Sequence, residues 1–303
     1  MSHDIRFQLL VLPNAPWDQL LKRIHLAEEL GFDVIATADH FVDWSNPPSP
    51  WFELPTLLGA MARETSRITI ASCVAQIPLR DPATMARQAL GVDQMSNGRF
   101  ELGLGIGLMT DPSYDIMGIP GWTLKERVAR FKEYLEVVDR LLCNELSSYD
   151  GEYYQIKDAY MNPRPIAKPR PPITVAAMGP KMLKLAATYA DTWNSLSFCE
   201  TFAEQLAETA HRVEQVKQHC DTIERDVGDL RMSYAMFDPG ARTSGGMFNY
   251  YESQETFVDI VRQVAALGVT EFSLYYPMKD EQVPKFERTV REVIPRLREE
   301  FAS

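Results

Sequence analysis

Short apolar runs and longer segments with helical spacing alternate along this chain, and this alternation limits its fold more than any other feature. The pattern repeats eight times in succession. The expected strands span 6–13, 33–37, 67–76, 98–107, 173–178, 191–197, 230–237 and 271–277. The expected helices span 17–32, 52–66, 82–96, 124–144, 180–190, 200–227, 253–267 and 280–300. An open doubly wound sheet rarely needs eight such units, whereas a closed barrel does. The sequence therefore predicts an α/β chain with a (β/α)8 TIM barrel.

Two stretches depart from the alternation. Residues 108–122 are rich in proline and glycine and are predicted to form a loop insertion after the fourth strand. An Asp-Gly pair between aromatic residues predicts a small hairpin near 147–156. Five prolines in 161–172 resemble a linker, but the alternation resumes directly after them, so we expect one domain over residues 1–303.

Charge and composition exclude several classes of partner. The chain has 303 residues and a net charge of −11, and it shows no basic stripe to bind a nucleic acid or an anionic membrane. No apolar stretch approaches the roughly 20 residues of a membrane span. The N-terminus lacks a basic region and a small-residue cleavage site, so no signal peptide is expected.

Cysteine and histidine spacing gives two further expectations. The four cysteines show no CxxC pair, which favours reduced thiols and a cytoplasmic location. The histidines form neither HxH nor HExxH, so no metal site is predicted.

The stretch "ATADHFVDW", residues 36–44, places a histidine where the second strand ends. Active sites of TIM barrels form at the carboxyl ends of the strands. A histidine side chain gains and loses a proton near neutral pH, so His40 is the candidate acid/base residue. Asp39 could orient His40 or cap a turn. The alternative is a histidine that is hydrogen-bonded in a loop and has no chemical role.

Two glycine-containing stretches follow other strands. "AMGPKM", residues 177–182, combines a strand end with a helix start, where free backbone N–H groups can bind a phosphate. Pro180 has no N–H, so the amides of Gly179, Lys181 and Met182 would have to bind the phosphate. The alternative is an ordinary turn between strand and helix that binds no ligand. "GLGIG", residues 103–107, matches no nucleotide motif and indicates close backbone approach or a bulge.

These stretches resemble the bacterial luciferase-like superfamily of flavin- and deazaflavin-dependent oxidoreductases. The resemblance covers most of the chain in order, including "AEELGFDVIATADHF" (27–41), "SRITIASCV" (66–74), "DPATMARQALGVDQMSNGRFELGLGIG" (81–107), "YDGEYYQIKDA" (149–159) and "PRPPITVAAMGPKMLKLAATYADTWN" (169–194). It implies a TIM barrel with an insertion. It also implies a cofactor ring across the strand ends and a small-molecule substrate.

The resemblance implies roles for particular residues. The "DHFVDW" segment is similar to that of deazaflavin-dependent sugar-phosphate dehydrogenases, which makes His40 the acid/base and places Trp44 beside the cofactor ring. A non-proline cis peptide that backs the ring maps to 72–74, and the cofactor phosphate maps to 177–182. The residues implied to bind the cofactor are His40, Trp44, Ser72, Cys73, Val74, Gly105, Gly107, Ala177, Met178, Gly179, Pro180, Lys181 and Met182.

The sequence also departs from those dehydrogenases. They carry a glutamate just after the glycines of the fourth strand, where this chain has Leu108 and Met109. They carry an acidic residue near the end of the first strand, where this chain has "LPNAP". A sugar phosphate is therefore not the expected substrate. Apolar side chains indicate a less polar pocket: Leu108, Met109, Met178, Phe237 and Phe248.

Three functions remain open at this point. The leading hypothesis is a hydride-transfer oxidoreductase that uses the deazaflavin coenzyme F420. The close rival is an FMN-dependent monooxygenase that uses O₂. The third is a non-catalytic relative, either flavin-binding or oligomer-forming, that has lost its chemistry. Homodimers are usual in the superfamily, so a homodimer is expected.

Overall fold

The computed structural model of this chain describes residues 4–44, 46–237, 250 and 253–302. The glycine-rich loop expected at 239–247, and Phe248 with it, lie outside the described residues. The chain divides into two compact units. Unit 1 comprises residues 1–11, 26–35 and 176–303, and unit 2 comprises residues 12–25 and 36–175.

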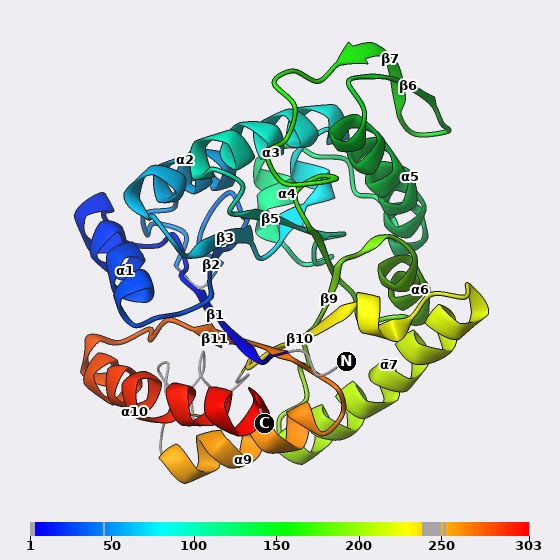
Figure 1. Cartoon of the computed structure of the whole chain (residues 1–303). Coiled ribbons are helices and arrows are strands. Elements are labelled where there is room, and N and C mark those ends of the chain that lie inside the picture. The colour runs from blue at the N-terminus through cyan, green and yellow to red at the C-terminus, as the bar shows by residue number, and fades with distance from the viewer. Residues whose placement is uncertain (1–3, 45, 238–249, 251–252, 303) are drawn as a thin grey trace. The chain divides into compact units, whose positions relative to one another are not determined.

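Unit 1 contains four parallel strands: β1 (Arg6–Leu10), β9 (Thr192–Ser195), β10 (Arg231–Ala235) and β11 (Glu271–Tyr275). Strand β11 pairs with β1 and β10, and β10 also pairs with β9. Its helices are α6 (Pro180–Tyr189), α7 (Phe202–Thr222), α9 (Gln254–Ala265) and α10 (Val283–Ala302), with α9 and α10 side by side in Figure 1. The rings of Phe7 and Phe272 stack with centroids 5.6 Å apart and anchor its core.

Unit 2 is built around β5 (Phe100–Gly105), which pairs in parallel with three strands. These are β3 (Thr69–Ser72), β4 (Ala75–Gln76) and β8 (Ile173–Ala176). Its helices include α2 (Leu54–Glu64), α3 (Pro82–Ser96), α4 (Pro112–Ile116) and α5 (Leu124–Cys143). Helix α1 (Trp17–Glu29) and strand β2 (Val34–Thr37) contribute residues to both units.

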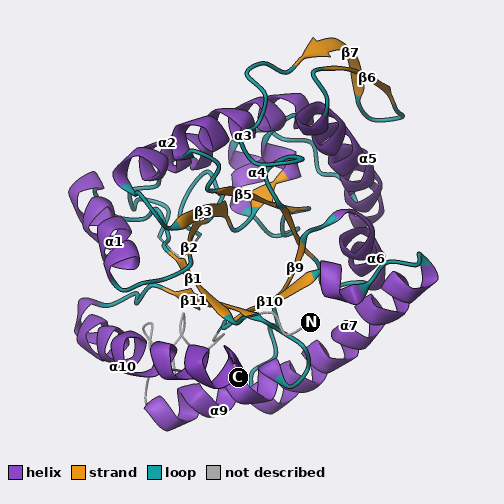
Figure 2. Cartoon of the chain, in the orientation of Figure 1, coloured by secondary structure: helices purple, strands orange, loops and turns teal. Residues whose placement is uncertain are grey.

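The strands are hydrogen-bonded in the order β3-β2-β1-β11-β10-β9-β8-β5-β4, and β3 also pairs with β5. Helices follow most of the parallel strands along the chain, and Figure 2 distinguishes the helices from the strands by colour. This strand order is that of a TIM barrel. The predicted fold class is therefore confirmed, and the insertion after the fourth barrel strand, β5, is present as well. The expectation that residues 1–303 form one domain stays a prediction.

Local sequence signals explain where the helices begin and end. Asp81 precedes α3 and accepts hydrogen bonds from the N–H groups of Ala83 and Thr84, and Pro82 occupies the first turn. Helix α2 has Pro55 in its first turn, where the missing N–H of proline is tolerated. Gly31 follows α1 with a φ of +77°, a left-handed conformation that glycine adopts without strain.

The strand expected at 67–76 is divided in two. Strand β3 ends at Ser72 and β4 begins at Ala75, because the backbone between them leaves the ladder. The peptide bond between Cys73 and Val74 is cis, as the resemblance implied for residues 72–74. The N–H of Cys73 instead donates to the carbonyl of Thr37, at 2.8 Å.

The insertion differs from the prediction in one respect. Residues 108–122 were expected to form a loop, but they contain the short helix α4. Asp111 caps this helix by accepting the N–H of Ser113, and Pro112 fits the first turn, where its missing N–H costs nothing. The Asp-Pro pair was therefore a helix-start signal within a segment dominated by loop residues.

The predicted hairpin is present as β6 (Leu146–Asp150) and β7 (Gln155–Tyr160), which pair antiparallel and lie beside α5 in Figure 1. The carboxylate of Glu133 on α5 accepts the backbone N–H groups of Glu152, Tyr153 and Tyr154. One side chain therefore ties the hairpin turn to the helix.

Two further observations concern the described part of the chain. None of its helices has the length and apolar composition needed to cross a membrane. Its four cysteines form no disulfide with one another.

The close packing of β5 against β3 gives the first testable prediction. A Cβ on Gly103 would lie 2.0 Å from the carbonyl oxygen of Ser72. We expect Gly103→Ala to lower the free energy of unfolding by about 1–3 kcal/mol, because backbone must move to accept the methyl group. Urea unfolding of the purified protein measures this change.

Gly91 in α3 is the matched control. A Cβ there would meet no atom within 4 Å. Because alanine has the higher helix propensity, Gly91→Ala is expected to stabilise the protein by about 0.5–1 kcal/mol. Equal effects of the two substitutions would contradict the packing argument.

Candidate functional site

His40 lies three residues after the end of β2 and is at the centre of a network of polar side chains within unit 2. Its side chain is 23% exposed. Ring nitrogen Nδ1 lies 2.8 Å from Oδ2 of Asp111, 2.9 Å from Nε2 of Gln76 and 3.0 Å from Nε1 of Trp44. All three contacts involve Nδ1, which leaves Nε2 available to a ligand.

Asp111 receives most of the donors in this network. Besides the contact with His40, its carboxylate accepts hydrogen bonds from Nε1 of Trp44 at 3.1 Å and Nε2 of Gln76 at 2.8 Å. The backbone N–H of Ser113 donates a further bond of 2.8 Å. The side chain is fully buried. A carboxylate has about four acceptor positions, and here each has a donor.

Burial by itself would raise the pKa of Asp111, because it disfavours the charged form. The hydrogen bonds from His40, Ser113 and Gln76 outweigh burial and lower this pKa to about 2. Asp111 is therefore an anion at any pH near neutrality.

The network also selects the tautomer of His40. Trp44 and the amide nitrogen of Gln76 can both donate to Asp111, so neither needs Nδ1 as an acceptor. The ionised carboxylate of Asp111 can only accept. We therefore assign the proton of the neutral ring to Nδ1, and the basic lone pair to Nε2.

Gln76 is held in place from its other end. Its Oε1 accepts a short hydrogen bond from the hydroxyl of Tyr114, which fixes the direction of the amide. Burial raises the pKa of Tyr114 to about 12, with the nearby charge of Asp111 as the next cause. A Cβ on Gly107 would lie 1.9 Å from the Tyr114 hydroxyl, and Gly107 has a φ of +73°. Only glycine fits this position.

Asp39 has a different environment from the one predicted. The carboxylate of Asp111, not that of Asp39, is hydrogen-bonded to the ring of His40. The buried Asp39 carboxylate instead forms a bidentate ion pair with Arg80 and accepts the backbone N–H of Gln76 at 2.9 Å. Burial raises the pKa of Asp39, and the charge of Arg80 opposes this effect. Asp39 thus positions the Gln76 backbone.

Two tryptophans surround the His40 ring. Trp44 meets it edge-on, with centroids 5.1 Å apart, and Trp51 lies at 5.5 Å. The buried Nε1 of Trp51 has no hydrogen-bond partner in the described chain. A polar atom of this kind, next to an ordered histidine, is a feature that a bound ligand would satisfy.

The residues expected at the interrupted third strand lie close to β5. The hydroxyl of Ser72 accepts the N–H of Gly103 and donates to its carbonyl, both at 2.8 Å. Cys73 and Val74 are partly exposed, and Gly105 pairs with Gln76 in the β4–β5 ladder. The close backbone approach predicted for 103–107 is confirmed at Gly103 and Gly107.

The stretch 177–182 belongs to unit 1. Strand β8 ends at Ala176, and α6 begins at Pro180 with Gly179 as its cap and no side chain bonded to the first amides. Ala177 is held between Asn194 and Trp193 by its N–H and carbonyl. Gly179, Pro180 and Lys181 are exposed, Met178 is partly exposed and Met182 is buried. The amides of 179, 181 and 182 remain open to an anion.

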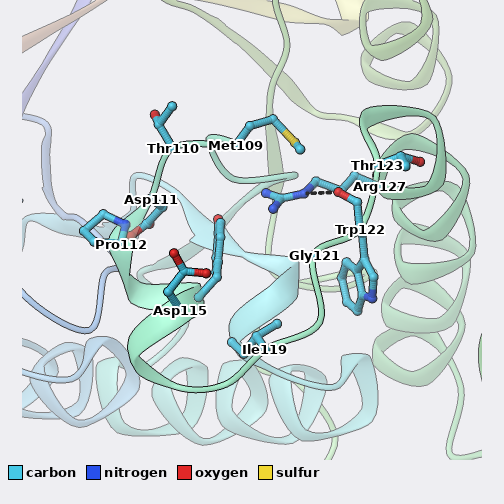
Figure 3. A pocket seen from close by; sticks show the side chains of 11 residues that line it. Met109, Thr110, Asp111, Pro112, Asp115, Ile119, Gly121, Trp122, Thr123 and Arg127 are labelled. Carbon is cyan, nitrogen blue, oxygen red and sulfur yellow. Dashed lines mark hydrogen bonds between the residues drawn. The ribbon is translucent and has the colours of Figure 1, made fainter.

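A pocket of about 410 Å³ lies in the insertion (Figure 3). Asp111 and Tyr114 line it, so the pocket adjoins the network around His40. Arg127 reaches it from α5, and Met109, Ile119 and Trp122 provide apolar surface. Among the described residues, no cluster of histidine, cysteine, aspartate and glutamate could hold a metal ion.

Sequence reasoning found His40 and Trp44 but missed Asp111, Gln76, Arg80 and Tyr114. Asp111 follows the glycines of β5, shortly after Leu108 and Met109. The helix-start signal of Asp111-Pro112 was available, but it does not reveal which side chain Asp111 contacts. Residues 39, 40, 44 and 72–74 belong to unit 2, and residues 177–182 belong to unit 1.

The strand order and the insertion after β5 define a TIM-barrel protein, and the ordered His40 follows the end of its strand β2. A family model described as luciferase-like monooxygenase matches residues 3–237. The chain belongs to this family, and the predicted superfamily is confirmed.

Curated relatives carry more specific names. The F420-dependent glucose-6-phosphate dehydrogenase of Intrasporangium calvum is 31% identical over 220 residues, which are 71% of this chain and 65% of that protein. The enzyme of the same name from Beutenbergia cavernae is 31% identical over 222 residues, or 69% of this chain and 63% of that protein. The chain thus spans slightly less than two thirds of the curated relatives it matches.

Solved structures show the same fold. An F420-dependent secondary alcohol dehydrogenase in complex with an F420-acetone adduct has a TM-score of 0.82 at 16% identity, covering 97% of this chain and 99% of that chain. The coenzyme F420 dependent tetrahydromethanopterin reductase of Methanopyrus kandleri has a TM-score of 0.78 at 18% identity, covering 97% and 100%. The monooxygenase RslO1 of Streptomyces bottropensis has a TM-score of 0.78 at 19% identity, covering 96% and 99%.

The lowered pKa of Asp111 predicts a pH-dependent stability. The pKa falls from its ordinary value of 3.8 to about 2 in the folded protein, so the stabilisation is complete above pH 4 and lost as the pH falls toward 2. Asp111→Asn is expected to reduce the free energy of unfolding by about 2 kcal/mol at pH 6. Urea unfolding between pH 3 and pH 7 should show this deficit shrinking at the acid end. A deficit independent of pH would contradict an ionised, hydrogen-bonded Asp111.

Proposed function

We propose that this protein is an oxidoreductase that uses coenzyme F420 for hydride transfer to or from a small organic molecule. The observation that carries the proposal is the His40–Asp111 pair, with its proton fixed on Nδ1 and Nε2 left free. The F420-dependent relatives, named for glucose-6-phosphate and secondary alcohol oxidation, support the cofactor and the reaction class.

The residues present suit such a cofactor. The first amides of α6 have no side-chain cap, and the space around Gly179 is open, as a bound phosphate requires. The unpartnered Nε1 of Trp51 beside His40 offers a donor to a polar ligand atom. We assign the phosphate to the backbone of Ala177, Met178, Gly179, Pro180, Lys181 and Met182. We assign the ring to His40, Trp44, Ser72, Cys73, Val74, Gly105 and Gly107.

When bound, F420 supplies a carrier that accepts or donates a hydride. The protein's own part is the proton. In the oxidative direction, Nε2 of His40 takes the proton of a substrate hydroxyl, and the charge that forms on the ring is stabilised by the ionised Asp111. In the reductive direction the same nitrogen returns the proton. Gln76, held by Tyr114 and by the Asp39–Arg80 pair, keeps the carboxylate in place.

The FMN-dependent monooxygenase is the second candidate, because the family model and RslO1 carry that name. In that case His40 would serve a flavin that reacts with O₂. We further propose a homodimer, a cytoplasmic location and a single domain, from the superfamily resemblance, the unpaired cysteines and the unbroken alternation. The net charge of −11 supports the absence of nucleic acid and membrane partners.

Cofactor binding separates the candidates. Oxidised F420 and FMN are titrated in parallel into the full chain without cofactor, and quenching of tryptophan fluorescence is followed. We expect tight binding of F420 and weak binding of FMN. The opposite order would assign the protein to the monooxygenase branch, and binding of neither would favour the non-catalytic relative.

Gly179→Asp tests the assigned phosphate position in the same titration. The carboxylate caps α6, which preserves stability, but it also occupies and repels the anion position. F420 affinity should fall while the unfolding midpoint stays the same or rises. Unchanged affinity would remove 177–182 from the site.

His40→Ala tests the proton transfer. Turnover with F420 and panels of alcohols, imines and activated alkenes should fall by about 10²- to 10⁴-fold, because the acid/base group is lost. F420 affinity should change little. His25→Ala is the matched control, since His25 is an exposed histidine paired with Glu64. Turnover that survives in His40→Ala would make His40 a structural residue.

A further inference from the structure

We propose that the pocket in the insertion binds a carboxylate group of an otherwise apolar substrate, with Arg127 as the recognition residue. The identification of this ligand as the substrate rests on the proposed function, whereas the binding of a carboxylate in the pocket does not. The pocket itself lies wholly within unit 2 and adjoins the His40 network through Asp111 (Figure 3).

Arg127 carries the argument because it is a buried cation without a counter-ion. The residue is 2% exposed, and in the described part of the chain no carboxylate lies within ion-pair distance of it. Its guanidinium donates to the carbonyls of Ile106, Leu108 and Trp122 at 3.2–3.4 Å. It also lies over the Tyr114 ring, 4.5 Å from the ring centroid, and interacts with the polar end of the Tyr114 side chain, so its partners in the described chain are neutral groups.

Other buried or half-buried arginines in the described part of the chain are better compensated. Arg80 is paired with Asp39, and Arg212 is paired with Glu208. Arg99 donates five bonds to oxygen atoms, none longer than 3.0 Å. A buried charge that lacks such partners is costly, so a site that retains one is suited to an anion supplied from outside.

The rest of the lining defines the ligand. Arg127 is the one cationic residue among those that line the pocket, which fits a monoanion better than a phosphate dianion. Its planar guanidinium matches the two oxygens of a carboxylate. Met109, Ile119 and Trp122 supply apolar contacts for the body of the molecule.

Two carboxylates also line the pocket and set limits on the ligand. Asp111 is already bonded to four donors, so its charge is directed toward the His40 network. Asp115 is exposed and opposes an anion through partly screened repulsion. Removal of the Asp115 charge should therefore tighten binding, which is the opposite of the effect of removing Arg127.

The test compares an acid with its neutral amide. Binding of 4-phenylbutyrate and 4-phenylbutyramide to the full chain without cofactor is measured by calorimetry. We expect the carboxylate to bind about tenfold more tightly or better, because a charged hydrogen-bonded pair is lost in the amide. Arg127→Gln should abolish this preference, Arg127→Lys should retain part of it, and Asp115→Asn should increase it.

Arg130→Gln is the matched control. Arg130 stacks on Trp122 at 4.4 Å from one turn further along α5 but does not line the pocket, so the preference should stay unchanged. No preference in the unaltered protein, or an undiminished preference in Arg127→Gln, would overturn the proposal. If Arg127→Gln does not fold, the proposal is tested with Arg127→Lys and Asp115→Asn alone. It would be overturned if the preference for the carboxylate neither falls in Arg127→Lys nor rises in Asp115→Asn. Parallel F420 titrations report on the proposed function separately.

Discussion

The buried carboxylate of Asp111 is the contact on which the site depends. Four donors from different parts of unit 2 meet there: a ring nitrogen, an indole, an amide and a backbone N–H. Their combined effect keeps the group ionised and fixes the proton of His40 on Nδ1. The surrounding pairs, Asp39 with Arg80 and Gln76 with Tyr114, hold the donors in position.

Most of the fold could be predicted from the sequence because periodicity and capping residues are local properties. The eight-fold alternation, the hairpin and the start of α3 after Asp81 were all predicted from neighbouring residues. Helix α4 was missed because five residues between prolines and glycines do not show a helical period. The division of 67–76 into β3 and β4 was not predicted, because its residues read as one continuous strand and the superfamily resemblance implied only the cis peptide at 72–74.

The site was less predictable, because its partners are distant in the sequence. His40 stood out by its position after a strand, yet Gln76 and Asp111 are 36 and 71 residues away along the chain. Adjacent residues suggested Asp39 as the partner of His40, but neighbours that follow a strand point in different directions. Arg127 belongs to an amphipathic helix, and the sequence of that helix does not reveal that the side chain is buried without a counter-ion.

One consequence concerns how proteins of this architecture can change. The segment after β5 supplies both the carboxylate that fixes His40 and the wall of the neighbouring pocket. Exchanging this segment between relatives would therefore replace ligand preference and proton chemistry together. Alteration of preference alone requires single substitutions on the pocket side, such as at Met109 or Trp122, that leave the Asp111-Pro112 helix start intact. The same coupling applies to natural and to engineered changes, because one segment contributes to both the His40 network and the pocket wall.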